Sequence, residues 1–165
     1  ASMVFIDYLR QTSDLERTVI ATPDVGGAKR ANSYAKFLGV PMVICHKSRA
    51  KANEVAEMTI IGDVTDKDVI LVDDIVDTAG TICKAADLMM QNGARSVRAV
   101  ASHAVLSDPA TERINASALK EMIFTDSIPL RKHSDKLHIV SVANIFAEAI
   151  NRVINHESIS ILYSI

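Results

Sequence analysis

The sequence has 165 residues, a length that suits one domain with a sizeable hydrophobic core. It contains 48% hydrophobic and 23% charged residues, no tryptophan, and a formal net charge of −2, which excludes a disordered chain and argues against a nucleic-acid partner. No apolar run approaches the ~20 residues of a membrane-spanning helix, and residues 1–9 lack the pattern of a signal peptide. We therefore expect a cytoplasmic protein that does not associate with membranes.

The first predicted unit is a strand at 18–21, followed by Asp24 and by a helix that opens at Gly26 and Gly27. Apolar residues then recur at helical spacing up to Gly39, which ends the helix. Because parallel strands share their carboxyl ends, Asp24 is expected at the same sheet edge as other acids that follow strands. An aspartate at such a position often caps the helix that follows it.

A basic segment follows the next predicted strand, at 41–45. Lys47, Arg49 and Lys51 occupy every second position, so in an extended arm all three cations lie on one side. From spacing alone, a solvated basic loop is the simplest interpretation.

The most informative stretch is VILVDDIVDTAGT, at 69–81. Residues 69–72 are apolar and mostly β-branched, which predicts a strand that is buried on both faces and ends at Asp73. Two adjacent carboxylates are costly to bury, and neighbouring strand residues point to opposite faces of a sheet. At least one of Asp73 and Asp74 must therefore meet solvent, a cation or hydroxyl groups, which indicates a binding site.

The loop after this strand is small and rich in hydroxyl groups, and it leads into a helix that ends at Gly93. A strand, a tight loop and a helix N-terminus present backbone N–H groups and the positive end of a helix dipole, an arrangement that cradles phosphate. The loop lacks the lysine of the GxxxxGK[ST] nucleotide loop, and a capped turn is the structural alternative. The loop residues are Asp77, Thr78, Ala79, Gly80 and Thr81.

The two cysteines, Cys45 and Cys83, stand far apart within apolar or helical patterns. This spacing predicts neither a disulfide scaffold nor a zinc-binding pair, so both are expected to be small core residues. Cys83 also falls in the first turn of the helix after the loop, a position that can lower the pKa of a thiol.

The rest of the chain continues the alternation of strands and helices. This alternation predicts a doubly wound, mostly parallel α/β sheet that forms one domain over residues 1–165. Further strands are predicted at 57–61, 96–105, 121–125 and 137–140, and helices at 109–117 and 142–153.

Two serines follow the last predicted helix. Ser158 and Ser160 flank an apolar residue, and an extended backbone would point both hydroxyl groups toward one anion. A polar tail is the alternative. We expect no nearby residue of this chain to supply a cation to these serines, so an anion there would need arginines from other subunits.

The segment DDIVDTAGT, at 73–81, resembles the ribose-5-phosphate loop of the phosphoribosyltransferase superfamily. Its flanks narrow the resemblance to the ribose-phosphate pyrophosphokinase family, and the similarity runs through nearly the whole chain. Ala79 departs from a pattern that often has a second glycine there, and Asp108 stands where glycine is usual. The supporting segments are ATPDVGGAKRA (21–31), HKSRAKAN (46–53), IIGDV (60–64) and NHESIS (155–160).

The resemblance implies a domain of the type I phosphoribosyltransferase kind, equivalent to the C-terminal half of a two-domain enzyme. It implies transfer of the β,γ-diphosphoryl group of ATP to the 1-hydroxyl of ribose 5-phosphate, which gives phosphoribosyl pyrophosphate and AMP, with Mg²⁺ as cofactor. This chain would be the ribose-5-phosphate-binding half, inactive alone. A phosphoribosyltransferase and a noncatalytic regulatory subunit of the pyrophosphokinase type are the alternatives.

The resemblance also implies roles for single residues. It gives Asp24 a divalent-metal role and makes Lys47 and Arg49 catalytic residues of a loop that holds phosphates. It places Ser158 and Ser160 at a regulatory site for phosphate and ADP, formed between the subunits of a homo-oligomer. The residues implied to bind ribose 5-phosphate, with its 2- and 3-hydroxyls on the acid pair directly or through Mg²⁺, are Arg49, Asp73, Asp74, Asp77, Thr78, Ala79, Gly80 and Thr81.

Overall fold

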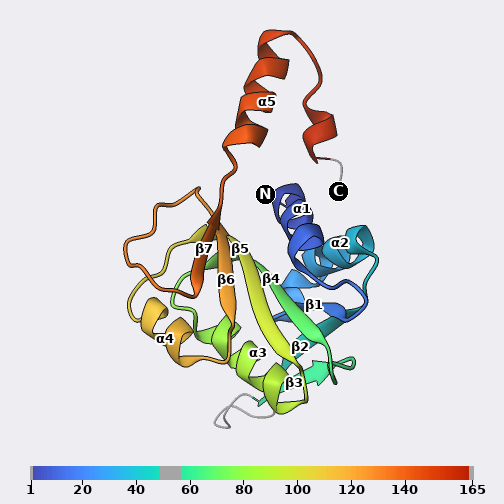
Figure 1. Ribbon diagram of the computed structural model, residues 1–165, viewed down its shortest axis with the longest axis vertical. Coiled ribbons are helices and arrows are strands. Elements are labelled where there is room, and N and C mark those ends of the chain that lie inside the picture. The colour runs from blue at the N-terminus through green and yellow to red at the C-terminus, as the bar shows by residue number, and fades with distance from the viewer. Residues whose placement is uncertain (1, 49–56, 164–165) are drawn as a thin grey trace.

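A seven-stranded sheet forms the centre of the computed structural model, which describes residues 2–48 and 57–163. Helices cover both faces of this sheet (Figure 1). The strands are β1 Thr18–Thr22, β2 Met42–Ser48, β3 Glu57–Ile61, β4 Asp68–Val76, β5 Ser96–Ala104, β6 Glu121–Thr125 and β7 Leu137–Val140. The helices are α1 Ser2–Thr12, α2 Ala28–Leu38, α3 Gly80–Gln91, α4 Ala110–Ala116 and α5 Ala143–Ile154, with the 3₁₀ turns η1 Val25–Gly27 and η2 Ser160–Tyr163.

The described sheet has the strand order β3-β2-β1-β4-β5-β6-β7. β3 is antiparallel to β2, and all other described strand pairs are parallel. This confirms the doubly wound, mostly parallel α/β fold. The chain builds outward from β1 to β3 and then returns to place β4 on the other side of β1. In sheets of this kind, ligands bind outside the carboxyl ends of the strands at such a reversal.

β4 is buried on both faces, as the apolar run 69–72 predicts. Val69 and Leu71 pack into the cluster that includes residues of α3 and α4, whereas Ile70 and Val72 pack into the cluster that includes residues of α1 and α2. Because side chains alternate between the faces of a strand, one short run joins both halves of the core. The close packing gives the residues after this run a rigid base.

Two strands run further than the sequence pattern predicts. β4 extends to Val76 rather than ending at Asp73, because its last residues pair with β5. β2 extends to Ser48, so Lys47 lies in a strand paired with β3 rather than in a solvated loop. Charged residues are poor strand formers locally, but the hydrogen bonds and packing of a neighbouring strand outweigh that preference.

The last helix stands apart from the sheet. α5 projects away from the rest of the molecule (Figure 1), and none of its residues, all of which the structure describes, is buried. Its predicted amphipathic character is confirmed, since the exposed Phe146, Ile150 and Val153 share one helical face. None of the described helices is long and apolar enough to cross a membrane.

Candidate active site

The loop between β4 and α3 forms a hollow at the carboxyl end of the sheet. Residues 77–81, together with Asp73, contribute to the lining of a cavity of about 160 Å³. α3 begins at Gly80, and no side chain of the described residues caps its N-terminus. The first N–H groups of an α-helix have no intrahelical acceptor, so they and the positive end of the helix dipole are available to an anion in this hollow.

Ala79 takes the left-handed conformation that the turn requires, with φ 58° and ψ 5°. A residue other than glycine is strained there by roughly 1–2 kcal/mol, which agrees with the glycine that the resembling pattern often carries. The Ala79 methyl group is buried in the core cluster that includes α3. Burial of this methyl group offsets part of the strain.

Arg113 of α4 holds the loop from outside. Its Nη1 donates to the carbonyl oxygen of Thr78 at 2.9 Å. The same nitrogen would lie 3.7 Å from a Cβ at Gly80, so it sits beside the start of α3. Sequence reasoning missed this residue, because it is 35 positions from Thr78 and belongs to an ordinary helical turn.

Among the described residues, the acid pair on β4 faces one cation. Arg30 of α2 places Nη1 3.3 Å from Asp73 Oδ1 and Nη2 2.6 Å from Asp74 Oδ2. Asp73 Oδ1 also accepts the backbone N–H of Asp74 at 2.8 Å. The prediction that the pair must meet solvent, a cation or hydroxyl groups is confirmed. Arg30 was missed, and its only signal in the sequence is its place in the first turn of the helix after β1.

The two carboxyl groups of the pair have opposite pKa shifts. Burial is the largest influence on Asp73, and with the nearby charge of Asp74 it raises the Asp73 pKa to about 6. Partial burial also acts upward on Asp74, but its hydrogen bond with Asp73 and the charge of Arg30 together lower the Asp74 pKa. Neighbouring acids with pKa values shifted in opposite directions, at the carboxyl end of a central strand, are typical of ligand sites.

Asp24 caps the turn that follows β1. Its Oδ1 accepts the backbone N–H of Gly27 at 3.0 Å, and its carbonyl oxygen accepts from Thr22 Oγ1 at 2.8 Å. A Cβ at Gly27 would lie 2.3 Å from Thr22 Oγ1, so this position requires glycine. One oxygen of the Asp24 carboxylate is therefore used by the turn, and the other retains lone pairs for a ligand.

The described residues contain no group of three or more His, Cys, Asp or Glu side chains placed to hold a metal ion. Mg²⁺ at phosphate sites is usually bound by one or two carboxylates, with water and phosphate oxygens as the other ligands. The hard oxygen donor of Asp24 fits that coordination. The metal role of Asp24 stays a prediction.

The two basic residues expected to be catalytic lie at the limit of the described chain. Lys47 pairs through its backbone with Met58 of β3. β2 runs parallel to β1, so Lys47 and Asp24 belong to the same edge of the sheet. The side chain of Lys47 and the whole of Arg49 lie outside the described residues, and their roles stay predictions.

Comparison with known proteins shows the family of this chain. The model of the phosphoribosyl synthetase-associated domain matches residues 47–164. The chain belongs to this family.

Two curated relatives share one name. The ribose-phosphate pyrophosphokinase of Porphyromonas gingivalis is 72% identical over 162 residues, which cover 98% of this chain and 52% of that protein. The enzyme of the same name from Helicobacter hepaticus is 51% identical over 162 residues, with 98% and 52% covered. The chain therefore spans about half the length of these relatives.

Solved structures agree with the family and with the fold. Phosphoribosylpyrophosphate synthetase from Mycobacterium smegmatis superposes with a TM-score of 0.87 at 33% identity, over 94% of this chain and 51% of that one. Adenine phosphoribosyltransferase from Trypanosoma brucei superposes with a TM-score of 0.57 at 19% identity, over 88% of this chain and 73% of that one, which shows a common fold alone. The resemblance inferred from residues 73–81 together with their flanking segments is thus confirmed at the level of the family.

In this family member the two C-terminal serines lie together. Ser158 Oγ and Ser160 Oγ are 2.8 Å apart, and the Ser160 backbone N–H donates to Ser158 Oγ at 3.2 Å. The expectation of no nearby cation is wrong, because the chain turns after α5 and brings Arg152 Nη1 to 3.5 Å from the Ser158 carbonyl oxygen. Arg152 is also paired with Glu148 and Glu157.

Both cysteines are free and buried, as predicted. Burial, followed by the charge of Asp24, raises the pKa of Cys45 to about 11. Burial also raises the pKa of Cys83. The lowered thiol pKa considered for Cys83 is therefore wrong, because burial outweighs its place near a helix start.

Asp108, where the resembling pattern has glycine, has a local partner. Lys132 Nζ lies 2.5 Å from Asp108 Oδ1 and 2.9 Å from Glu112 Oε1. The aspartate therefore joins an exposed ion-pair cluster that connects α4 with the loop before β7.

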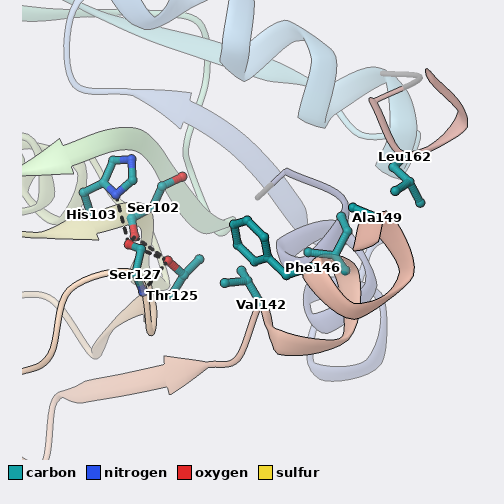
Figure 2. A pocket seen from close by; sticks show the side chains of 9 residues that line it. Ser102, His103, Thr125, Ser127, Val142, Phe146, Ala149 and Leu162 are labelled. Atoms are coloured by element: carbon teal, nitrogen blue, oxygen red, sulfur yellow. Dashed lines mark hydrogen bonds between the residues drawn. The ribbon is translucent and has the colours of Figure 1, made fainter. Parts of the chain in front are cut away.

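A second hollow, of about 290 Å³, lies between the ends of β5 and β6 and the helix α5. Figure 2 shows His103 Nδ1 hydrogen-bonded to Ser127 Oγ, at 2.9 Å. Thr125 Oγ1 and Ser127 Oγ donate to the Ser102 carbonyl oxygen at 2.7 and 3.0 Å, and Phe146 points toward this cluster from α5. These contacts describe a histidine held by its neighbours, and no catalytic role is assigned to it.

Proposed function

We propose that this chain is the ribose-5-phosphate-binding part of a ribose-phosphate diphosphokinase and forms a domain equivalent to the C-terminal half of a two-domain enzyme. The observation that carries the proposal is the uncapped start of α3 beside Asp73 and Asp74, where the strand order reverses. An anion site next to a pair of carboxylates matches the two ends of a sugar phosphate. Relatives named ribose-phosphate pyrophosphokinase, at up to 72% identity, support the same activity.

In this proposal the 5-phosphate of the sugar lies against residues 77–81. The N–H groups at the start of α3 and the hydroxyl groups of Thr78 and Thr81 donate hydrogen bonds to it. The 2- and 3-hydroxyls of ribose donate to Asp73 and Asp74. These contacts orient the 1-hydroxyl for attack on the β-phosphorus of ATP, so the contribution of this part of the protein is positioning.

Charge neutralisation is assigned to Mg²⁺ and to the basic segment after β2. Asp24 would hold the metal, which when bound supplies positive charge to the phosphates of ATP. Lys47 and Arg49 would bind the phosphates that move, and Arg49 would also contact ribose 5-phosphate. These assignments rest on the resemblance of ATPDVGGAKRA and HKSRAKAN, and on the shared sheet edge of β1 and β2.

We further propose that the full-length protein acts in the cytoplasm as a homo-oligomer regulated by phosphate and ADP. Ser158 and Ser160 would contribute to the regulatory site. Their hydroxyl oxygens lie 2.8 Å apart and share a hydrogen bond, so the two groups meet at one point, and that bond would open for both to donate to one anion. Arg152 adds a cation on the same chain, although two glutamates already pair with it.

Calorimetric titration of this chain tests the binding role. Ribose 5-phosphate should bind saturably, inorganic phosphate should bind more weakly, and ribose without its phosphate should not bind. Thr81→Ala should weaken the binding of ribose 5-phosphate with the fold retained. Absence of ribose-5-phosphate binding, or unchanged affinity in the variant, would mean that residues 77–81 form only a structural turn.

An activity assay tests the reaction. The full-length protein, supplied with ATP, Mg²⁺ and ribose 5-phosphate, should release AMP, whereas this chain alone should not. Release of pyrophosphate from phosphoribosyl pyrophosphate only in the presence of a purine or pyrimidine base would instead identify a phosphoribosyltransferase.

A further inference from the structure

Arg30 connects two parts of the molecule that the strand order separates. It lies in the first turn of α2, the helix that follows β1, and it reaches two residues of β4. Its side chain is 31% exposed. A Cβ at Gly27 would lie 3.9 Å from Arg30 Nη1, so the guanidinium group also lies beside the turn that follows β1. The arginine therefore spans the point where ligands of such a sheet bind.

Arg30 also changes how the acid pair is presented. Neighbouring residues of a strand point to opposite faces, yet Asp73 and Asp74 both reach the same guanidinium group, at 3.3 and 2.6 Å. The Asp74 backbone N–H fixes the same Asp73 oxygen at 2.8 Å. Each carboxylate thus has one oxygen directed at a rigid planar donor and a second oxygen with lone pairs for a ligand.

We infer that Arg30 is a positioning residue that holds the Asp73 and Asp74 carboxylates together as one acceptor for two neighbouring hydroxyl groups of the sugar. This inference rests on the proposed function. It adds a physical reason why the site would select a sugar phosphate with two neighbouring hydroxyl groups over one that lacks either of them. A planar guanidinium group with parallel N–H donors suits two acceptors, whereas an ammonium group is a point charge. Without the Arg30 guanidinium group, the two negatively charged carboxylates repel each other and move apart, so each sugar hydroxyl meets a less well placed acceptor.

The test compares ribose 5-phosphate with 2-deoxyribose 5-phosphate, which lacks one hydroxyl group of the pair. Calorimetry on this chain should show that the unaltered protein prefers ribose 5-phosphate. Arg30→Met keeps an unbranched side chain of similar length to the aliphatic part of arginine and removes its donors. We expect it to lower the affinity for ribose 5-phosphate by roughly 10- to 100-fold, the usual effect of losing a hydrogen bond to a charged group. It should change the affinity for the deoxy sugar far less.

Two further variants separate positioning from charge and from general stability. Arg30→Lys keeps the positive charge but lacks the parallel N–H donors of the guanidinium group. It should therefore recover only part of the preference for ribose 5-phosphate over the deoxy sugar. Arg95→Met provides a matched control, because Arg95 pairs with Asp68 on the same strand, at its other end, and Arg95 Nε donates to Asp68 Oδ1 at 2.9 Å. This control should leave the binding of both sugars unchanged.

The outcomes are distinct. If Arg30→Met retains the preference for ribose 5-phosphate, or if Arg30→Lys matches the unaltered protein, the inference is overturned while the proposed function stands. If Arg30→Met does not fold, Arg30→Lys decides, because partial loss of the preference supports positioning and full retention contradicts it. Failure of the unaltered chain to bind ribose 5-phosphate would overturn the proposed function itself.

Discussion

The units β1–α2 and β4–α3 both place an acid near a strand end and a glycine at a helix start, but they use their backbone N–H groups differently. In the first unit, Asp24 accepts the N–H of Gly27, and Thr22 donates back to the Asp24 carbonyl oxygen. In the second unit, no described side chain caps α3, and the chain turns through the left-handed Ala79.

The difference separates a turn in which a side chain accepts a backbone N–H from a turn that leaves its N–H groups open to a ligand. Backbone N–H groups at a helix start must find an acceptor, and an aspartate two or three positions earlier is the simplest one. In the second unit Asp73 and Asp74 lie further back on the strand and turn toward an arginine. Asp77 stands three positions before Gly80, yet no described side chain caps α3, so the helix start stays open to an anion. Asp24 in the closed turn should stabilise the fold, whereas ionised Asp73 in the open unit, whose pKa is raised, should oppose it.

The largest effect is expected of Asp73→Asn, which should weaken the binding of ribose 5-phosphate. Loss of a charged acceptor should lower the affinity for ribose 5-phosphate by roughly 10- to 100-fold. Calorimetry on the folded variant measures this change, and an unaltered affinity would remove Asp73 from the site.

The same variant should stabilise the folded protein, although it weakens ligand binding. The pKa of Asp73 in the folded protein is raised to about 6, so its ionisation opposes folding above pH 6, and this opposition disappears as the pH falls toward the ordinary pKa of the group. At pH 7, Asp73→Asn should therefore raise the free energy of unfolding by about 1–2 kcal/mol relative to its effect at pH 4. Urea denaturation at both pH values tests the sign.

Glycine replacements should distinguish the two turns by stability. Gly27→Ala puts a Cβ 2.3 Å from Thr22 Oγ1 in a buried turn, and such overpacking typically costs 1–3 kcal/mol, so we expect about that loss. A Cβ at Gly80 would lie 3.7 Å from Arg113 Nη1 and 4.0 Å from Thr78 Oγ1, which are ordinary contacts. Gly80→Ala should therefore change the free energy of unfolding by less than about 0.5 kcal/mol. Equal losses in thermal denaturation would contradict the contrast.

Removal of the cap tests the closed turn directly. Asp24→Ala should lower the free energy of unfolding by about 1 kcal/mol, the usual effect of losing an N-cap side chain. In buffer without divalent metal it should leave the affinity for ribose 5-phosphate unchanged. A loss of affinity without metal would place Asp24 in the sugar site rather than in the cap.

The smallest expected effect is that of Ala79→Gly at the turn of the open unit. Relief of roughly 1–2 kcal/mol of left-handed strain is opposed by the greater chain entropy of glycine and by the loss of a buried methyl group, each near 0.8 kcal/mol. Because these contributions nearly cancel, the net change in the free energy of unfolding should stay within about 0.5 kcal/mol. Equilibrium denaturation checks it, and a large loss would show that the alanine methyl group, rather than the backbone turn, holds the loop.

Local patterns in the sequence predicted most of the elements and the loop. The run 69–72 shows a strand buried on both faces because four consecutive apolar residues admit few other uses. The strands at 121–125 and 137–140 have the predicted bounds, since polar residues flank short apolar runs there. The loop at 77–81 could be found because small residues between a strand and a helix reflect local backbone geometry.

The sequence by itself therefore determined the α/β class, the turn of small residues at 77–81 and the cost of placing two acids together, which depend on neighbours in the chain. Only the tertiary structure decided that β4 continues to Val76, that Arg30 meets both acids, and that Arg113 holds Thr78. Arg30 is 43 and 44 residues from the acids it contacts. No local pattern can reveal such partners, because strand order and helix packing bring them together.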